Sequence, residues 1–463
     1  IMTKSAEKLY MSYAVKNSEG AALMPSYIIR SMRKMFSHCL KLSYKDTAQQ
    51  NSYVTIPRAA NSFDNTEIAA NVDENIIDSL TGGRLVGSVT SFENFAECPL
   101  RYYLRYGVDL KEREEFTFSP VNFGVVLHAV IREVCDEIKK NGESYYLISE
   151  EKRREMVKRS VAAITDIYQN SILKDSSRNS FMIKRMEDLA DRTVWAMGEQ
   201  LKCGDFVPFV FEHKFNMEVG DGDRKQLMSG TIDRVDICEN GTDVYVRIID
   251  YKTGKKDFNI VKTYYGIDIQ LMVYMEAAMK LVAKMRPGKN VIPAGVFYYN
   301  ISDPIVSATT ESAEEIEDKI KGELRLKGMV NSDKDIAEKM DNTEGTSLNI
   351  PVSRKADGGF DSRRSKVMNT EQFNILGRFV DVRAIDTADR IAGGDIRRSP
   401  YKDGQFSSCD RCPYGAVCGF SVDLPGCNYR KLKKFDDEVL WNNIKEGVDE
   451  NGKKMDTGAE ERD

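Results

Sequence analysis

The stretch from Gly230 to Gly254 constrains the fold of this chain more than any other. Two runs rich in Ile, Val and Tyr flank Asn240-Gly241, a pair typical of a type I′ β-hairpin turn. With these two residues as the turn, Glu239 pairs with Thr242, and every later pair along the two strands follows from that one. The sequence therefore predicts a β-hairpin with a defined register.

Three charged side chains of the hairpin share a face in this register. Asp233 lies opposite Ile248, and Asp233, Asp250 and Lys252 point to one side, whereas Asp236 points to the other. Two carboxylates on neighbouring strands can share a hard divalent cation, with oxygen ligands at about 2.0 to 2.1 Å for Mg²⁺. A lysine beside them can orient or deprotonate a water molecule, or offset charge on a phosphate. A surface hairpin with solvated charges is the alternative, and the apolar residues beside the acids favour a site.

An Asp, a gap and then Asp-x-Lys on a hairpin resembles the PD-(D/E)xK nuclease superfamily, although Ile232 stands where the superfamily has Pro. The resemblance implies an enzyme that hydrolyses DNA phosphodiester bonds with Mg²⁺. It makes Asp233 and Asp250 the metal ligands, with the backbone carbonyl of Tyr251 as a further ligand. Lys252 then acts on the attacking water or on the charge of the phosphate.

A helix expected at about residues 122–140 carries Gly124 and His128 on one face, since they are four positions apart. A lone histidine on an apolar helix is most often a core residue with a hydrogen-bond partner. RecB-type nucleases of the superfamily have a G-x-x-x-H helix before the sheet, and this resemblance makes His128 an aid to the metal site. Glu212, in the expected strand FEHKF, stands where these nucleases often have an acid, but an ordinary exposed glutamate is an equally good interpretation.

An apolar helix expected at about residues 267–285 carries the polar pair Gln270 and Tyr274 on one face. Such a pair needs hydrogen-bond partners when it is buried, and a bond to the sheet is the simplest explanation. RecB-type nucleases carry Q-x-x-x-Y at this point. The resemblance therefore implies that Gln270 and Tyr274 position the DNA strand, together with Arg234 beside the first acid.

The cysteines provide a second strong pattern. Nine cysteines in a chain for which we expect no secretory leader argue against a disulfide framework. The spacing Cys409-x2-Cys412-x5-Cys418 is too tight for ordinary packing, and no histidine is near enough to complete a zinc site. A fourth thiolate is needed. Cys427 would complete a local four-cysteine zinc knuckle, whereas Cys98 would join two distant parts of the chain.

The contexts AECPLRYYLRYG and CDRCPYGAVCGF resemble the AddB family, the second subunits of bacterial AddAB helicase-nucleases. In that family a distant first cysteine and a close triplet bind a 4Fe-4S cluster, which suits its four-thiolate ligation. The resemblance favours this cluster over zinc, with Cys98, Cys409, Cys412 and Cys418 as ligands and Cys427 unused. It also implies an AddA-like helicase-nuclease partner and DNA fed as a single strand from duplex ends. The expected role is exonuclease action in end resection and recombinational repair of double-strand breaks.

The expected order of elements between residues 88 and 301 is αβββαβ, the core of restriction-endonuclease-like folds. We therefore expect an α/β protein with a mixed sheet flanked by helices, large helical insertions and the iron-sulfur staple. A net charge of -5 gives no overall attraction to nucleic acid, so DNA contacts must come from local basic patches. No run of 18 apolar residues occurs, which predicts no membrane span and a bacterial cytoplasmic protein.

We expect the nuclease domain, including the cluster, at residues 88–435. Residues 1–40 resemble the end of the helicase-like region of AddB, residues 41–87 read as a polar linker, and residues 436–463 as a charged tail. Within the domain, Thr370 is expected to cap a helix that follows a loop rich in Gly and Ser.

Two other functions remain open. One is a non-catalytic iron-sulfur scaffold that binds DNA; a missing catalytic acid, lysine or histidine would favour it, and none is missing. The other is a stand-alone iron-sulfur nuclease of the CRISPR-adaptation type. The helical insertions and residues 1–36 argue against that alternative.

Overall fold

The computed structural model describes residues 86–111, 120–167, 177–219, 226–307, 312–423 and 427–459, with a few isolated positions before residue 74. The chain divides into two compact units, residues 1–64 and 65–463, and the second carries the site. The helicase-like remnant and the linker expected at residues 1–87 lie almost wholly outside the described residues.

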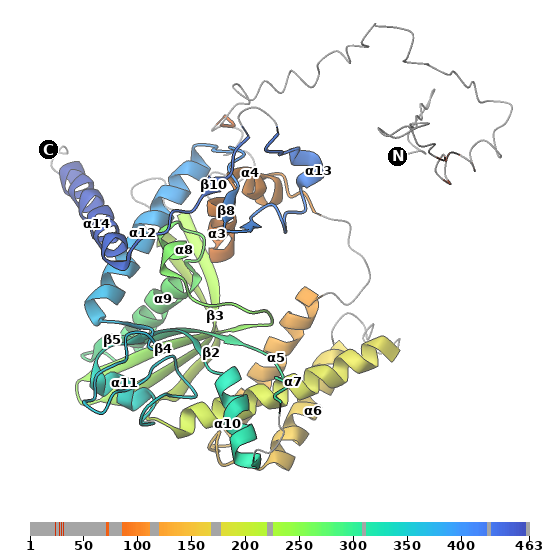
Figure 1. Cartoon of the computed structure of the whole chain (residues 1–463), viewed down its shortest axis with the longest axis vertical. Coiled ribbons are helices and arrows are strands. Elements are labelled where there is room, and N and C mark those ends of the chain that lie inside the picture. Colours follow the sequence, from red (N-terminus) through yellow and green to blue (C-terminus); the bar gives the residue numbers. More distant parts are fainter. Residues whose placement is uncertain are drawn as a thin grey trace, which may run out of the picture. The chain divides into compact units, whose positions relative to one another are not determined.

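A mixed sheet forms the centre of the second unit (Figure 1). Three of its four long strands are antiparallel neighbours: β2 (Val207–Val219), β3 (Gln226–Asn240) and β4 (Asp243–Lys252). On the far side of β4 the sheet continues through β5 (Asn290–Asn300), which is parallel to β4, β6 (Lys327–Asn331) and β7 (Val367–Met368). A short strand, β1 (Val86–Ser88), pairs in parallel with the start of β3.

Two buried clusters cover the two faces of this sheet. One joins the odd-numbered residues Tyr245 and Ile249 of β4 to α5 (Pro120–Lys140), α6 (Glu150–Ile167) and α7 (Ser177–Lys202). The other joins the even-numbered residues of β4 to α3 (Val89–Glu97), α9 (Gln270–Met285) and α12 (Thr370–Ala392). This alternation follows the two-residue period of a strand. The order α5, β2, β3, β4, α9, β5 confirms the predicted α/β fold with its αβββαβ core.

The hairpin of β3 and β4 forms, but its register differs from the predicted one. Asn240 pairs with Asp243, so Gly241 and Thr242 make the loop. Of these residues only Gly241 has a positive φ, of 58°, so the turn is not of type I′, which needs two. A shift of one residue on each strand keeps the same side chains on each face. The pair furthest from the turn is Arg234 with Ile249, so Asp233 lies just beyond the end of this ladder.

Helical insertions extend this core: α8 (Ile260–Tyr264) before α9, and α10 (Ala313–Glu323) and α11 (Lys334–Met340) after β5. The N-cap of α12 is Asn369 rather than the expected Thr370. The Asn369 side chain accepts a hydrogen bond from the backbone amide of Gln372, and the Gln372 side chain accepts one from the backbone amide of Asn369. None of the helices in the described part of the chain is long and apolar enough to cross a membrane.

The expected charged tail at residues 436–463 is a helix over most of its length, α14 (Asp437–Ala459). Leu440 and Ile444, four positions apart, are buried in the cluster that contains α12. This apolar pair explains the helix, since one buried stripe stabilises a helix within charged sequence.

The cysteines of the site belong to two segments, one directly after α3 and the other after α12. The helix ends at Cys98, whose backbone is extended, and Pro99 begins the short helix α4 (Pro99–Tyr102), followed by a π-helical turn at Tyr103–Gly107. Pro99 thus stands at a break between two helices, as expected of a residue that cannot continue a helix. The other cysteines belong to a segment with the small strands β8 (Tyr401–Asp403), β9 (Phe406–Ser407) and β10 (Arg430–Lys431) and the turn of helix α13 (Gly415–Cys418).

Candidate active site

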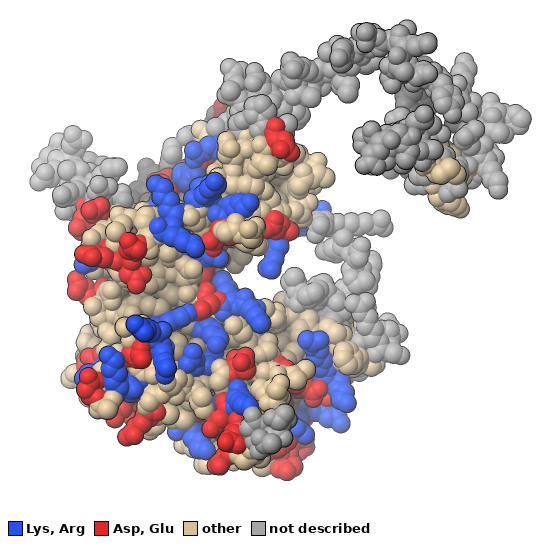
Figure 2. Space-filling view, in the orientation of Figure 1, with Lys and Arg blue, Asp and Glu red and all other residues tan. Residues whose placement is uncertain are grey.

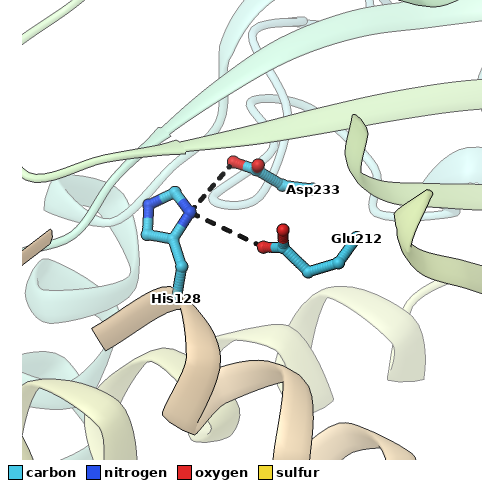
Figure 3. Close-up of side chains that lie close together, drawn as sticks. All are labelled: His128, Glu212 and Asp233. Carbon is cyan, nitrogen blue, oxygen red and sulfur yellow. Dashed lines mark ion pairs between the residues drawn. The ribbon is translucent and has the colours of Figure 1, made fainter. Parts of the chain in front are cut away.

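Three side chains from three elements converge beside the end of the β3–β4 ladder (Figure 3). His128 comes from α5, Glu212 from β2 and Asp233 from β3, and their ligand atoms all lie within 4.8 Å of one another. His128 Nδ1 is 3.5 Å from Asp233 Oδ2 and 3.7 Å from Glu212 Oε1. Burial lowers the pKa of His128, but the two carboxylates outweigh burial and raise it to about 10. The cluster therefore stabilises positive charge.

The backbone of Glu212 is strained at this point. Its φ is 46°, although its neighbours Phe211 and His213 pair regularly with β3. A left-handed conformation costs a residue with a side chain about 1 to 2 kcal/mol. Strain of this kind persists where the surrounding structure imposes it, and it occurs often at functional sites. Here it accompanies a glutamate that faces His128 and Asp233, so the structure favours the site interpretation of Glu212 over that of an ordinary strand residue.

Asp250 and Lys252, at the end of β4, form the second part of the site. Burial and the neighbouring Asp233 raise the pKa of Asp250 to about 6, although Lys252 opposes the shift. Lys252 Nζ lies 2.5 Å from Asp250 Oδ2, an oxygen that is otherwise without a hydrogen-bond partner in the described part of the chain. The backbone amide of Tyr251 donates to Asp233 Oδ2 at 2.7 Å, so β4 holds the first acid in place.

Gln270 and Tyr274, the polar pair on α9, form a chain of hydrogen bonds that ends at Lys252. Gln270 Oε1 accepts a hydrogen bond from Lys252 Nζ at 3.0 Å, and Gln270 Nε2 donates to the Tyr274 hydroxyl at 2.9 Å. Gly230 leaves room for this arrangement, because a Cβ there would lie 2.7 Å from the ring of Phe215 and 3.0 Å from that of Tyr274. Gln270 and Tyr274 are 8% and 6% exposed. Their bond to the sheet is thus observed, and a role in positioning DNA stays a prediction.

The predicted DNA contact of Arg234 is wrong. Its side chain is 1% exposed and forms a bidentate pair with Asp236, with Nε to Oδ1 at 2.7 Å and Nη2 to Oδ2 at 2.6 Å. Arg247 also donates to Asp236, at 2.9 Å. A guanidinium enclosed in this way cannot reach a DNA strand. Arg234 follows Asp233 in the sequence, but successive residues of a strand point to opposite faces, so its side chain lies on the opposite face from that of Asp233.

The four cysteines expected to bind iron and sulfide line one small cavity: Cys98, Cys409, Cys412 and Cys418. Cys427 is buried and is not among the residues that line this cavity. The structure thus brings Cys98, near the start of the domain, to the triplet near its end, as the staple requires.

Backbone N–H groups act on two of these sulfurs. Burial raises the pKa of the Cys98 thiol. Backbone N–H groups of Arg101, Ser399 and Leu100 oppose this rise, because they stabilise the thiolate. A backbone N–H of Phe420 acts in the same way on Cys418. Donors to the sulfur atoms are a feature of iron-sulfur sites.

Both groups of residues fit the cofactors that the sequence implies. An imidazole and two carboxylates that converge, beside the buried carboxylate of Asp250, suit a divalent cation. Four thiols around one cavity, two of them with backbone N–H donors, suit a cluster with four-thiolate ligation.

One contact of the site had no sequence signal. Glu93, on α3, accepts hydrogen bonds from the backbone amides of Ile269 and Gln270, both at 3.0 Å. Glu93 precedes Gln270 by 177 residues, so no local pattern could join them. For Glu212 the sequence signal was its place in the strand before the hairpin, which fits a site residue and an ordinary strand residue equally well. Its strained backbone favours the site residue.

These side chains and the sheet that carries them define a nuclease of one structural class. The sequence profile of the PD-(D/E)XK nuclease superfamily matches residues 87–419, a range that includes each of the site residues described above. The chain therefore belongs to the PD-(D/E)XK nuclease superfamily, as the hairpin predicts.

Curated relatives make the comparison more specific, and they confirm the predicted resemblance to the AddB family. The chain is 32% identical, over its whole length, to the AddB subunit of the ATP-dependent helicase/deoxyribonuclease from Caldanaerobacter subterraneus subsp. tengcongensis. Proteins with the same name from Clostridium acetobutylicum and Thermoanaerobacter sp. are 30% and 29% identical over 97% and 98% of the chain. The chain spans 44% of the length of each of these relatives.

Proposed function

We propose that this chain is the nuclease part of an AddAB-type helicase-nuclease and that it acts as a metal-dependent DNA exonuclease in double-strand-break resection and recombinational repair. The observation that carries the proposal is the convergence of His128, Glu212 and Asp233 beside the pair Asp250 and Lys252. Membership of a nuclease superfamily and relatives named deoxyribonuclease subunits support it. The intact set of acids, histidine and lysine disfavours a non-catalytic scaffold.

In this proposal His128, Glu212, Asp233 and Asp250 hold Mg²⁺, together with the backbone carbonyl of Tyr251. A bound divalent cation would neutralise charge on the scissile phosphate. Lys252, held by Asp250 and Gln270, orients the attacking water or stabilises the charge that develops on the phosphate.

A 4Fe-4S cluster on Cys98, Cys409, Cys412 and Cys418 is the second proposed cofactor. It would tie the end of α3 to the segment after α12, and so join the two ends of the nuclease domain, residues 88–435. The cavity that the four cysteines share supports this proposal, and the position of Cys427 outside that lining argues against a zinc knuckle of Cys427 with the triplet.

DNA and an AddA-like subunit are the proposed partners. The relatives are named as one subunit of a helicase/deoxyribonuclease, which supports a heterodimer that feeds a single strand to the nuclease in the bacterial cytoplasm. Figure 2 shows a band of Lys and Arg across the middle of the face that it draws, with Asp and Glu interspersed on either side. Such a local basic band supports DNA binding by a chain whose net charge is -5.

The test uses the full chain, purified without oxygen, and end-labelled single-stranded and duplex DNA with Mg²⁺ or with EDTA. We expect cleavage only with the metal ion, and its loss in Asp250→Ala with DNA binding nearly unchanged. Asp243→Ala is the matched control, because Asp243 lies at the start of the same strand, where its side chain pairs with Asn290, away from the site. Undiminished cleavage by Asp250→Ala would refute the assigned site. If neither the chain alone nor the chain with its partner subunit cuts DNA, the scaffold is the better interpretation.

A further inference from the structure

The N-terminus of α9 is capped by a residue from another helix. Ile269, the N-cap residue of α9, makes no side-chain cap, and its backbone amide and that of Gln270 both donate to Glu93 Oε1 at 3.0 Å. The first amides of a helix have no partner within the helix, and a carboxylate at this position also interacts favourably with the helix dipole. Glu93 of α3 therefore holds the start of α9.

The residue at that start is the one that holds the lysine. Gln270 is the first residue of α9, and its side chain accepts the hydrogen bond from Lys252 Nζ. Its backbone amide is bonded to Glu93, so the two contacts meet on one residue. A continuous path of polar contacts thus runs from Glu93 through Gln270 to Lys252, and from there to Asp250.

The helix that carries Glu93 is itself anchored at its end. Cys98 is the C-cap residue of α3 and lines the cysteine cavity, one helical turn beyond Glu93. Glu93 is therefore attached to the cysteine site through α3 and to the nuclease site through Gln270.

We propose that Glu93 is a positioning residue for the reaction, which places Lys252 through Gln270. This inference rests on the proposed nuclease function. Glu93 touches neither the acids nor His128 in the contacts above, so it acts through the lysine and not on the metal ion.

Hydrogen exchange tests the capping step without any need for activity. In the full chain, Glu93→Ala should speed the exchange of the backbone amides of Ile269 and Gln270, measured by mass spectrometry on peptides that span residues 267–274. Glu97→Gln is the matched control, because Glu97 lies one turn further along α3 and pairs with Arg101 instead. Unchanged exchange in Glu93→Ala would overturn the proposal, whether or not the chain cuts DNA.

Cleavage kinetics test the effect on the lysine. Glu93→Ala should lower kcat by about tenfold to a hundredfold, with KM for DNA within about twofold, since a displaced catalytic group affects the reaction more than binding. Glu93→Gln should recover most of the rate, because its amide oxygen still accepts the two hydrogen bonds. In a Lys252→Ala background Glu93→Ala should cause no further loss. Full activity of Glu93→Ala, or equal losses with and without Lys252, would overturn the proposal, whereas metal-dependent cutting by the unmodified chain reports separately on the proposed function.

Discussion

Glu212 Oε1 lies 3.7 Å from His128 Nδ1, and the Glu212 backbone reaches this position with a φ of 46° in the middle of β2. Phe211 and His213 on either side pair in register with β3, and no other described residue of β2 has a positive φ, so the strain is confined to the residue that faces the histidine. We infer from this local strain that stability and activity are opposed at Glu212, and both can be measured.

We expect Glu212→Gly to be more stable than Glu212→Ala by about 1 kcal/mol in EDTA, because both variants lose the contact with His128 but only glycine adopts a positive φ without strain. Metal-dependent cleavage should fall at least about tenfold if Glu212 is the metal ligand that we propose. Thermal unfolding and end-labelled cleavage measure the two effects. Lys214→Gly, at an exposed position of the same strand with ordinary φ, should instead lose about 0.5 to 1 kcal/mol. A Glu212→Gly chain that cuts at full rate would show that Glu212 is not a ligand.

The cysteine site predicts a difference between two buried cysteines. Cys98→Ala should lose iron and sulfide from anaerobically purified protein and should unfold at a lower temperature, because a cluster that binds only the folded chain stabilises it. Cys427→Ala should keep both iron and sulfide, since Cys427 does not line the cavity. Elemental analysis and the visible absorption spectrum measure the cluster. Zinc in place of iron, with a neutral Cys98→Ala, would contradict the staple.

The buried ion group on the opposite face of the hairpin should be structural. Asp236 is 0% exposed and accepts from both Arg234 and Arg247, so Asp236→Ala would leave two guanidinium groups buried without their carboxylate. Loss of one partner from such a group costs about 3 to 5 kcal/mol. Asp243→Ala, which removes a partly exposed acid of the same hairpin, should cost less than about 1 kcal/mol. Urea denaturation measures both, and equal losses would be the contrary result.

A pair of carboxyl groups between α9 and α12 predicts a dependence of stability on pH. Burial and a hydrogen bond with Glu276 raise the pKa of Asp381 from 3.8 to about 8. The folded chain therefore binds this proton more tightly than the unfolded chain, so the free energy of unfolding decreases as pH rises from about 4 through about 8. Asp381→Asn should make this decrease smaller and, at pH 9, should stabilise the protein by about 1 kcal/mol or more.

Denaturation curves at pH 6 and pH 9 measure this effect. The matched control is Asp386→Asn on the same helix, because Asp386 is about half exposed and pairs with Arg390. We expect its stability to follow the pH dependence of the unmodified chain. A pH dependence in Asp381→Asn as large as that of the unmodified chain would place the proton elsewhere.

The local pattern of the sequence determined the elements and most of the chemistry. Alternating Ile and Val around a Gly turn specify two strands, and Asp-x-Lys places its acid and lysine on one face whichever register the turn selects. The cysteine spacings and the break at Pro99 are local in the same sense, and the same pattern led to the superfamily that the comparison shows.

Tertiary structure decided which of these side chains meet. The loop residues Gly241 and Thr242 set a register that propensity alone did not give, and the alternation of β3 buries Arg234 against Asp236 instead of aiming it at DNA. Glu212 faces His128 with a strained backbone. Glu93 reaches the site through a contact with Gln270, 177 residues further along the chain. Such contacts depend on how distant segments pack. A periodicity of two or of 3.6 residues shows which side of an element a residue occupies, but not what lies opposite it.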